Sequence, residues 1–198
     1  MNTWDQRYGE LGYVYGEAPN VFFANTIEKF SPGKVLLPCE GEGRNGVFAA
    51  LLGWEVKAFD SSIIGKNKAM KLADKKGVKL EYLVKDATEV LYENEYFDVI
   101  GLIYAHFPPN IRFAIHQRIL KFLKPGGTII LEAFNPLQLK NTSGGPKDIA
   151  MLYSVDILKK DFEGLHFKTL ETTKVNLEEG KLHEGEAEVI RMVASLPY

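Results

Sequence analysis

A loop of seven residues, Glu40 to Gly46, combines three glycines with two carboxylates. The glycines Gly41, Gly43 and Gly46 match the pattern G-x-G-x-x-G, after an apolar run and before a helical pattern. Such a loop brings a ligand close to the N–H groups at a helix N-terminus. A dinucleotide site is the usual interpretation of this pattern, and a tight turn that needs positive φ is the alternative.

The charge of this loop argues against a pyrophosphate ligand. Glu40 and Glu42 flank Gly41, and each would lie about 6 Å from a bound phosphate, where one like-charge pair costs on the order of 2–3 kcal/mol. A ligand that carries an ammonium and a sulfonium beside its carboxylate avoids this repulsion. S-adenosylmethionine is such a ligand, so we expect it here.

Two further acids follow the next two strand-like runs. Asp60 ends the run 54–60, and Asp86 follows the run 79–84. At the carboxyl end of a parallel strand, Asp60 can accept from both hydroxyls of an adenosine ribose, whichever cofactor carries it. Asp86 can accept from the adenine amino group. The alternative role for Asp60 is to cap the next helix.

The elements that would position these residues alternate between strand and helix, which predicts βαβ units and a parallel sheet. Strand-like runs cover 34–39, 54–60, 79–84, 97–103 and 128–134, and helical patterns cover 44–52, a stretch from Ser61 or Ser62 to Gly77, and 109–123. After a helix near 154–162, the runs 165–177 and 186–195 are joined by a short polar turn, which allows only an antiparallel pair. We therefore predict an α/β fold with a doubly wound, Rossmann-like, mostly parallel sheet. A C-terminal antiparallel hairpin closes this sheet, and helices cover both of its faces.

The chain has 198 residues, of which 45% are hydrophobic and 25% charged, enough to bury one core. We expect one domain over 1–198. It divides into an N-terminal lid segment (1–30), a cofactor-binding core (34–134) and a C-terminal substrate-side helix and hairpin (135–198).

Charge and cysteine content exclude several classes of function. A net charge of −2 gives no field for a polyanion, so we expect no nucleic-acid partner. The one cysteine, Cys39, excludes an intrachain disulfide and a Cys-rich zinc site, and we expect no metal. No apolar stretch approaches the roughly 20 residues of a membrane span, and the N-terminus has no signal-peptide pattern. We expect a cytoplasmic monomer or homodimer.

Several motifs in order resemble the class I S-adenosylmethionine-dependent methyltransferases. They are VLLPCEGEGRN, Asp60, Lys85-Asp86-Ala87, FDVIGLIYAHF, LKPGG and the hairpin HEGEAEVIRMVA. Within that superfamily the chain is most similar to the small tellurite-resistance (TehB-type) and thiopurine-type group, through Gly43-Arg44-Asn45 and Trp4-Asp5-x-Arg7-Tyr8. The resemblance is firm over 34–134 and looser at both ends. It implies S-adenosylmethionine as cofactor and a small acceptor such as a thiol, selenium or tellurium compound.

The sequence departs from the family at three positions. The family usually has an acid at Leu37 and a glycine at Cys39, and Glu40 replaces a common small residue. We expect Glu40 to carry the acidic function on the loop, where it meets the methionine ammonium directly or through water. Cys39 is expected to pack as a small residue rather than to act as a nucleophile.

The resemblance also implies a set of cofactor-binding residues. The N-terminal segment closes on the cofactor in the resembling group, although a surface helix that buries Trp4 and Tyr8 is the alternative. Tyr104 and Phe107 follow the fourth strand, and we expect them to be walls near the sulfonium, where aromatic faces are favourable. The full set is Trp4, Arg7, Tyr8, Glu40, Gly41, Glu42, Gly43, Arg44, Asp60, Ser61, Asp86, Ala87, Tyr104 and Phe107.

Methyl transfer is an in-line displacement that needs alignment and exclusion of water, and needs a base only when the nucleophile must lose a proton. His106, the one histidine of the central region, is our candidate catalytic residue, to orient an anion or take a proton. The alternative is a histidine merely bonded within its loop. His183 and Arg191 are weaker candidates, because a turn histidine is usually solvated and Arg191 can extend to solvent.

Three functions remain open from the sequence. The leading one is transfer of a methyl group from S-adenosylmethionine to a small molecule. An NAD(P)-dependent oxidoreductase is the alternative enzyme, but no catalytic Tyr-x-x-x-Lys lies among the central strands. A non-catalytic S-adenosylmethionine-binding protein is the third.

Overall fold

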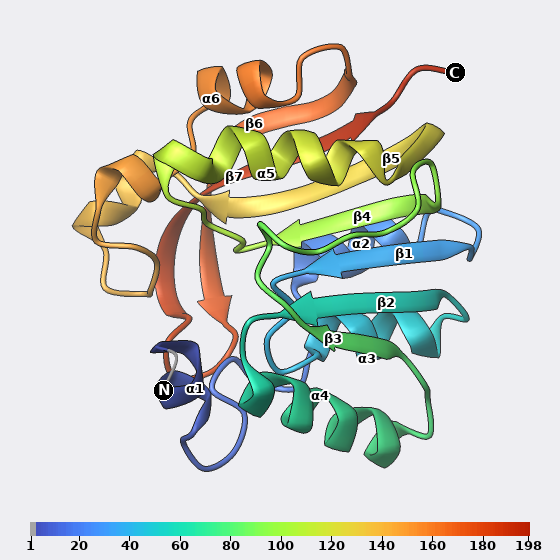
Figure 1. Cartoon of the computed structure of the whole chain (residues 1–198). Helices are drawn as coiled ribbons and strands as arrows, with labels where there is room; N and C mark the ends of the chain where they lie inside the picture. Colours follow the sequence, from blue (N-terminus) through green and yellow to red (C-terminus); the bar gives the residue numbers. More distant parts are fainter. Residues whose placement is uncertain (1–2) are drawn as a thin grey trace.

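The computed structural model describes residues 3–198 and is built on one seven-stranded sheet with the order β3-β2-β1-β4-β5-β7-β6 (Figure 1). The strands β1 to β5 are mutually parallel, and β7 pairs antiparallel with both β5 and β6. Their bounds are β1 Lys34–Pro38, β2 Glu55–Asp60, β3 Glu81–Val84, β4 Phe97–Ile103, β5 Leu123–Phe134, β6 His166–Glu178 and β7 Glu184–Ser195. The predicted Rossmann-like sheet with a closing antiparallel hairpin is confirmed. The strand order reverses between β1 and β4, the position at which such sheets bind ligands.

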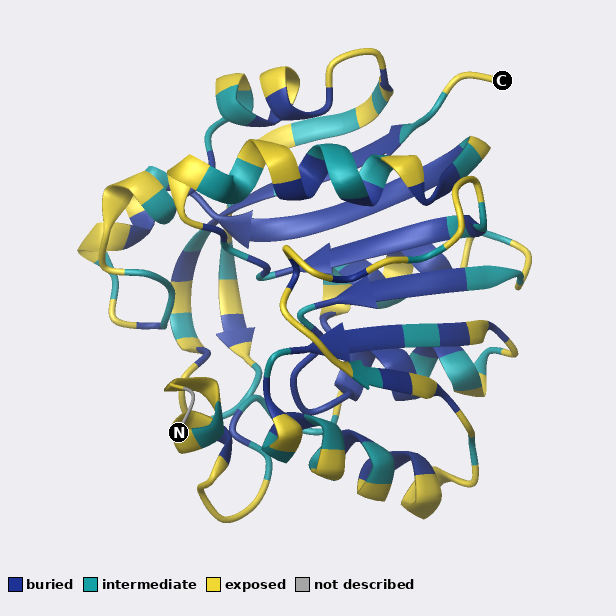
Figure 2. Cartoon of the chain, in the orientation of Figure 1, coloured by how far each residue is buried: buried dark blue, intermediate teal, exposed yellow. Residues whose placement is uncertain are grey.

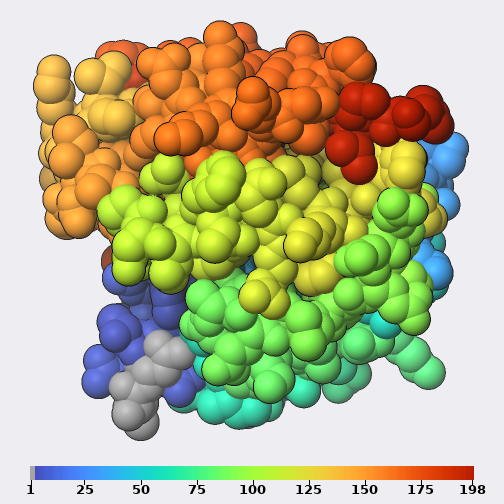
Figure 3. Space-filling view, turned by 45° about the horizontal axis from the view of Figure 1, so that its top comes forward, coloured from blue at the N-terminus to red at the C-terminus, as the bar shows by residue number. Residues whose placement is uncertain are grey.

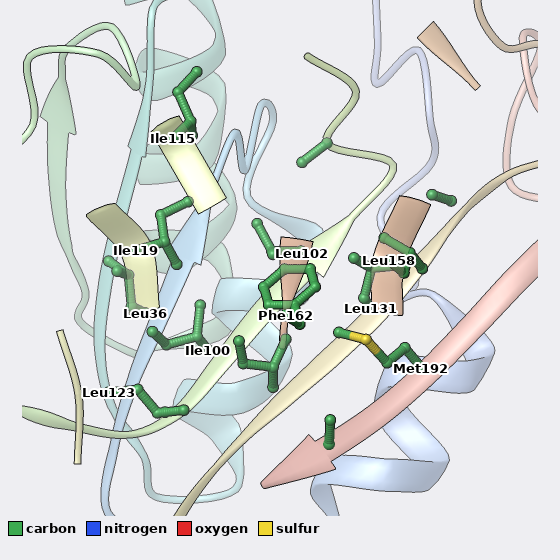
Figure 4. Close-up of a cluster of buried hydrophobic side chains, with 14 of the residues drawn as sticks. Leu36, Ile100, Leu102, Ile115, Ile119, Leu123, Leu131, Leu158, Phe162 and Met192 are labelled. Atoms are coloured by element: carbon green, nitrogen blue, oxygen red, sulfur yellow. The ribbon is translucent and has the colours of Figure 1, made fainter. Parts of the chain in front are cut away.

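Helices cover both faces of the sheet. Neighbouring residues along each strand point to opposite faces, so an apolar strand offers buried side chains to the helices on each side. One cluster of buried side chains joins Leu36 and Ile100 to residues of α5 and α6, as Figure 4 shows. The other joins Val35 and Leu37 to α2, α3 and α4. The helices are α1 Thr3–Tyr8, α2 Val21–Ile27, α3 Arg44–Leu51, α4 Ile63–Lys76, α5 Pro109–Lys121 and α6 Val155–Asp161, with short 3₁₀ helices at η1 Pro136–Lys140 and η2 Ile149–Met151.

The helix and strand limits follow local chemistry. Ser62, rather than Ser61, caps α4, because its Oγ accepts from the Gly65 N–H at 3.0 Å, and Gly77 ends the helix with φ of 70°. The weak helical pattern after Asp86 forms no helix, since the Asp86 carboxylate bonds to the backbone and hydroxyl of Thr88. Strand β5 starts at Leu123, five residues before the predicted position.

Burial varies between the strands (Figure 2). The strands β1 and β4 are dark blue almost throughout, whereas the edge strand β6 alternates between exposed and half-buried residues. Of the helices in residues 3–198, none is long and apolar enough to cross a membrane.

The part of the N-terminal segment over residues 3–18 lies at the carboxyl ends of the parallel strands, where its blue surface adjoins green and yellow-green atoms in Figure 3. It is tied down by acids at each end. Asp5 Oδ1 accepts from the Ser62 hydroxyl at 2.5 Å, and Glu42 Oε2 accepts from the Val14 N–H at 2.8 Å. The turn between β6 and β7 approaches the same segment, because the backbone at Gly180 contacts that at Gly16.

The close approach of α4 to the glycine loop predicts a difference between two glycine substitutions. Gly43 has φ of 88°, and a methyl group there would overlap Ala69 Cβ and come within 2.7 Å of its Cα; Gly77 has similar φ but open space around it. We expect Gly77→Ala to cost about 1–2 kcal/mol of backbone strain and Gly43→Ala to cost about 3 kcal/mol or more, because overpacking is added. Urea unfolding measures both. Equal losses would show that α4 does not confine the loop.

Candidate functional site

A cavity of about 490 Å³ lies at the carboxyl ends of the parallel strands. It is walled by the glycine loop, by the residues that follow β2, β3 and β4, by the N-terminal segment and by the turn of the C-terminal hairpin. The structure thus brings together nearly all residues that the sequence singled out. Those that line it are Trp4, Arg7, Tyr8, Glu40, Glu42, Arg44, Asp60, Ser61, Asp86, Ala87, Tyr104, His106 and Phe107.

Gly41 and Gly43 do not line the cavity but shape the loop through their backbone. Both have positive φ, 60° and 88°, which glycine adopts at least cost. The Gly41 N–H donates to Asp60 Oδ2 at 3.1 Å, and its carbonyl accepts from the Tyr82 hydroxyl at 2.6 Å. These two bonds fix the loop against the ends of β2 and β3.

Glu40 lies under the first turn of α3, which Gly43 caps without a side-chain bond. Its Oε1 accepts from the Gly46 N–H at 2.7 Å, and its Oε2 lies 3.5 Å from the Asn45 side-chain amide. Burial raises the pKa of Glu40 to about 7, although the Gly46 bond and the Arg44 charge oppose the shift. The helix N-terminus on which a pyrophosphate would lie is therefore already bonded to a carboxylate of the chain itself.

Glu42 has a different role from the one expected of it. Its two oxygens bond to the Lys68 ammonium at 2.8 Å and to the N–H groups of Val14 and Tyr15. The carboxylate is thus neutralised, and it holds the N-terminal segment onto the loop. We correct the expectation that Glu42 repels an anion across the loop.

Asp60 and Asp86 lie at the ends of β2 and β3, as predicted. Asp60 accepts from the Ser62 and Gly41 N–H groups at 2.9 and 3.1 Å, and burial raises its pKa to about 6. Asp86 is exposed, and its Oδ1 bonds to Thr88. No residue within 3–198 bonds to Asp86 Oδ2.

The N-terminal aromatic residues stack beside the cavity. The Trp4 and Tyr8 rings are stacked at 5.5 Å, and the Arg7 guanidinium lies 4.7 Å from the Trp4 ring. Tyr8 is 4% exposed but Trp4 is 40% exposed, so only half of the alternative prediction, a helix that buries both rings, holds. Arg7 donates to the Tyr15 hydroxyl at 3.1 Å.

The wall after β4 and β5 is aromatic. Tyr104, with φ of 53°, donates its hydroxyl to Glu132 Oε1 at 2.9 Å. Its ring centroid lies 4.7 Å from that of Phe134 and 4.5 Å from that of His183, and Tyr15 lies 4.6 Å from His183. These four rings form one apolar wall of the cavity.

His106 lines the cavity, but its bonding contradicts the predicted role in proton transfer or anion binding. Its Nδ1 lies 2.7 Å from the Met151 carbonyl, and its Nε2 accepts from the Phe134 N–H at 3.1 Å. Both nitrogens are therefore engaged, and burial lowers the pKa of the ring to about 4. The neutral His106 ring links β5 to the segment before α6 through these two hydrogen bonds. This is the alternative that the sequence left open.

His183 is buried instead of solvated, which corrects the sequence-based expectation; it is 5% exposed. Its Nδ1 lies 3.3 Å from Glu179 Oε2, which is the one side-chain hydrogen bond of His183 within residues 3–198. Burial lowers the pKa of His183 below its usual value, although the bond to Glu179 opposes the shift. Burial alone would raise the pKa of Glu179, but the bonds to His183 and Arg44 outweigh it and lower that pKa to about 2.

Sequence reasoning missed Tyr15, Phe134 and Glu179. The signal for Glu179 was an acid four residues before a histidine in one polar turn. Arg191 lies outside this cavity: its Nε donates to Glu132 Oε2 at 2.6 Å, and it borders a second cavity behind the N-terminal segment. It is not a residue of the candidate site. Cys39 lines the site, and burial raises the pKa of its thiol, which keeps it unreactive.

Comparisons with known proteins agree with the fold. The family described as methyltransferase domain matches residues 35–127, from β1 into β5. The tRNA (uracil(54)-C(5))-methyltransferase of Pyrococcus furiosus is 32% identical over 142 residues, which cover 65% of this chain and 33% of that protein. The chain thus spans about a third of the length of the curated relative it matches.

Two solved structures share the fold at low identity. TehB from Haemophilus influenzae superposes with a TM-score of 0.74 at 17% identity, over 98% of this chain and 65% of that one. A structure described for the conversion of a disulfide bond into a thioacetal group during echinomycin biosynthesis has a TM-score of 0.72 at 18% identity, over 91% of this chain and 82% of that one. The two structures and the sheet order thus agree on a Rossmann-like methyltransferase fold, and the family match places residues 35–127 in the region of it that resembles a methyltransferase domain.

Proposed function

We propose that this chain transfers the methyl group of S-adenosylmethionine to a small acceptor, a thiol or a selenium or tellurium compound. The observation that carries the proposal is the make-up of the one cavity described above. Acids that suit adenosine lie where β2 and β3 end, and an aromatic wall that includes His183 also lines the cavity. The sulfonium of the cofactor supplies an activated methyl group, so the chain must chiefly bind, align and exclude water.

We assign the cofactor-binding residues by their chemistry. Asp60 would bind the ribose hydroxyls, and the unengaged Oδ2 of Asp86 would accept from the adenine amino group. Glu40 would face the ammonium of the amino-acid end. The rings of Tyr104 and Phe107 suit the sulfonium, because aromatic faces attract cations. Trp4 and Tyr8 would cover the bound cofactor.

The cover over the cavity favours a small acceptor. The N-terminal segment contributes Tyr15 to the cavity wall, and the hairpin turn contributes His183 from the same side. Their covering position leaves little room for a macromolecular acceptor. The net charge of −2 provides no field to hold one, although the Pyrococcus furiosus relative is named for tRNA. The TehB likeness supports a tellurium or selenium acceptor only through the fold.

The Glu179–His183 pair, rather than His106, suits acceptors that must lose a proton. His183 Nε2 would take the proton from a thiol, and the ionised Glu179 at Nδ1 would stabilise the resulting imidazolium. Acceptors that are already anions need no such step. The rings of Tyr15 and Tyr104, whose centroids lie 4.6 and 4.5 Å from that of His183, would limit the access of water there.

Turnover assays test the proposed function directly. We expect the purified chain to bind S-adenosylhomocysteine but not NADH in calorimetry, and to methylate at least one member of a panel of small thiols, selenite and tellurite. Product is measured by mass spectrometry. The control is Asp60→Ala, which lacks the carboxylate that we assign to the ribose hydroxyls. Methylation of a tRNA transcript but of no panel member would overturn the small-acceptor proposal, and tight NADH binding would overturn the cofactor.

The charge of Glu40 predicts a pH dependence of binding. Burial holds the pKa of Glu40 near 7 and that of Asp60 near 6, so both become ionised as the pH rises. S-adenosylhomocysteine carries an ammonium in this range, and its affinity should rise from pH 6 to pH 8. Glu40→Gln should weaken it about tenfold at pH 8, the effect of one charge-assisted contact, and should remove the rise above pH 7. Adenosine, which has no ammonium, is the control; an equal loss for adenosine means that Glu40 acts on loop shape alone.

A substitution of His183 separates proton removal from binding. His183→Gln should lower turnover of a thiol by roughly ten- to a hundredfold at pH 7 and leave S-adenosylhomocysteine affinity within about twofold. The deficit should shrink as the pH approaches about 8.5, where a thiol ionises in solution. The charged and titratable groups that face His183 are Glu179, Arg44, Glu132, Tyr15, Tyr104 and His106.

His106→Gln is the matched control for that experiment. It breaks two hydrogen bonds of the His106 ring, so we expect a lower urea midpoint but an unchanged shape of the pH profile. If His106→Gln changes the pH profile and His183→Gln does not, the assignment of the base is wrong.

A further inference from the structure

Arg44, the first residue of α3, lies where the glycine loop meets the hairpin turn. Its Nη2 donates to Glu179 Oε2 at 2.9 Å, 135 residues away in the sequence. Its Nη1 is buried and has no hydrogen-bond partner among residues 3–198. The side chain is 8% exposed, and the residue lines the cavity.

The surrounding acids do not satisfy this guanidinium. Glu179 shares its charge among three donors, since it also accepts from Asn20 at 2.9 Å and lies 3.3 Å from His183. Glu40 is close enough for the Arg44 charge to oppose its pKa shift, but its Oε1 bonds to Gly46. A buried charged donor without an acceptor costs more than an ordinary unmade hydrogen bond. Arg44 therefore retains a donor and part of its charge for a group that enters the cavity.

The position of Arg44 limits where that group would lie. Its charge acts on Glu40 at the glycine loop and on His183 and Tyr104 at the aromatic wall. An anion at Nη1 would thus lie between the amino-acid end of the cofactor and the place of the acceptor. A carboxylate suits a guanidinium by geometry as well as by charge.

We propose that Arg44 Nη1 anchors a carboxylate-type anion inside the cavity. The anion belongs either to the amino-acid end of the cofactor or to an acidic acceptor. The proposal rests on the proposed function for the identity of the occupant. Glu179 competes with this anion for Arg44, because its Oε2 already accepts a hydrogen bond from Nη2.

Calorimetry with two cofactor fragments tests the first source. S-adenosylhomocysteine carries the amino-acid end, and 5′-methylthioadenosine lacks it. If the cofactor supplies the anion, Arg44→Gln should weaken S-adenosylhomocysteine ten- to fiftyfold and leave 5′-methylthioadenosine within twofold. If Arg44→Gln does not fold, Arg44→Lys, which keeps the charge but lacks the planar pair of donor nitrogens, should weaken S-adenosylhomocysteine three- to tenfold.

Steady-state kinetics with a pair of thiols tests the second source. Mercaptoacetate carries a carboxylate, and 2-mercaptoethanol is its neutral counterpart. If the acceptor supplies the anion, Arg44→Gln should raise KM for mercaptoacetate at least tenfold relative to 2-mercaptoethanol, with unchanged S-adenosylhomocysteine affinity. The anion subsite is overturned if neither the S-adenosylhomocysteine affinity nor the KM ratio changes in a folded variant.

Glu179→Gln distinguishes ligand binding from a purely structural ion pair. Removing the competing carboxylate should leave the affinity for the same anion, measured by calorimetry, unchanged or tighter. If Glu179→Gln and Arg44→Gln lose affinity alike, the pair merely holds the hairpin turn and the subsite is overturned. A wild-type chain that binds no S-adenosylhomocysteine at all overturns the proposed function instead, which is a separate outcome.

Discussion

A carboxylate buried against the first turn of α3 determines what the cavity can accept. Glu40 takes the Gly46 N–H for itself, and desolvation raises its pKa to about 7. In a dinucleotide-binding sheet the same helix N-terminus stabilises a pyrophosphate. Here that place is occupied by the Glu40 carboxyl, which becomes negatively charged as the pH rises through about 7. The glycine loop that follows keeps the shape of such a site, through Gly41 and its bonds to Asp60 and Tyr82, while its electrostatics favour a cation.

The segments that cover the cavity are held by two further acids, whose bonding partners lie far away in the sequence. Glu42 binds the N-terminal segment at Val14, and Glu179 binds α3 at Arg44 across 135 residues. Neither contact belongs to the sheet. The strand ends therefore form one side of the cavity, which we call its floor. The N-terminal segment and the hairpin turn form the other side, its roof, and contacts outside the sheet hold them in place. Because both carboxylates are largely buried, salt screens these contacts far less than it screens ion pairs at the surface.

The residues of the floor could be predicted from the sequence, whereas the roles of the residues in the roof could not. The strand runs, Asp60 and Asp86 could be predicted because a parallel sheet sends consecutive carboxyl ends to one edge, so order along the chain determines neighbourhood. His106 and His183 could not be ranked in this way. Which nitrogen is free depends on the Met151 carbonyl, the Phe134 N–H and the Glu179 carboxylate, groups that the sequence does not place beside either ring.

The division between floor and roof also explains why the fold leaves the acceptor open. The contacts that we propose to adenosine come from strand ends, which the hydrophobic core holds in register, whereas loops are free to vary. The contacts that we propose to the acceptor come from Tyr15, Phe134 and His183, which line the cavity from a loop, a strand end and a hairpin turn. Methyl transfer asks little of these residues beyond dryness and alignment, so few proton-handling groups are needed. Within residues 3–198, Arg44 Nη1 has no hydrogen-bond partner and the His183 ring is hydrogen-bonded through Nδ1 alone, so these are the polar groups by which we propose that an acceptor is chosen.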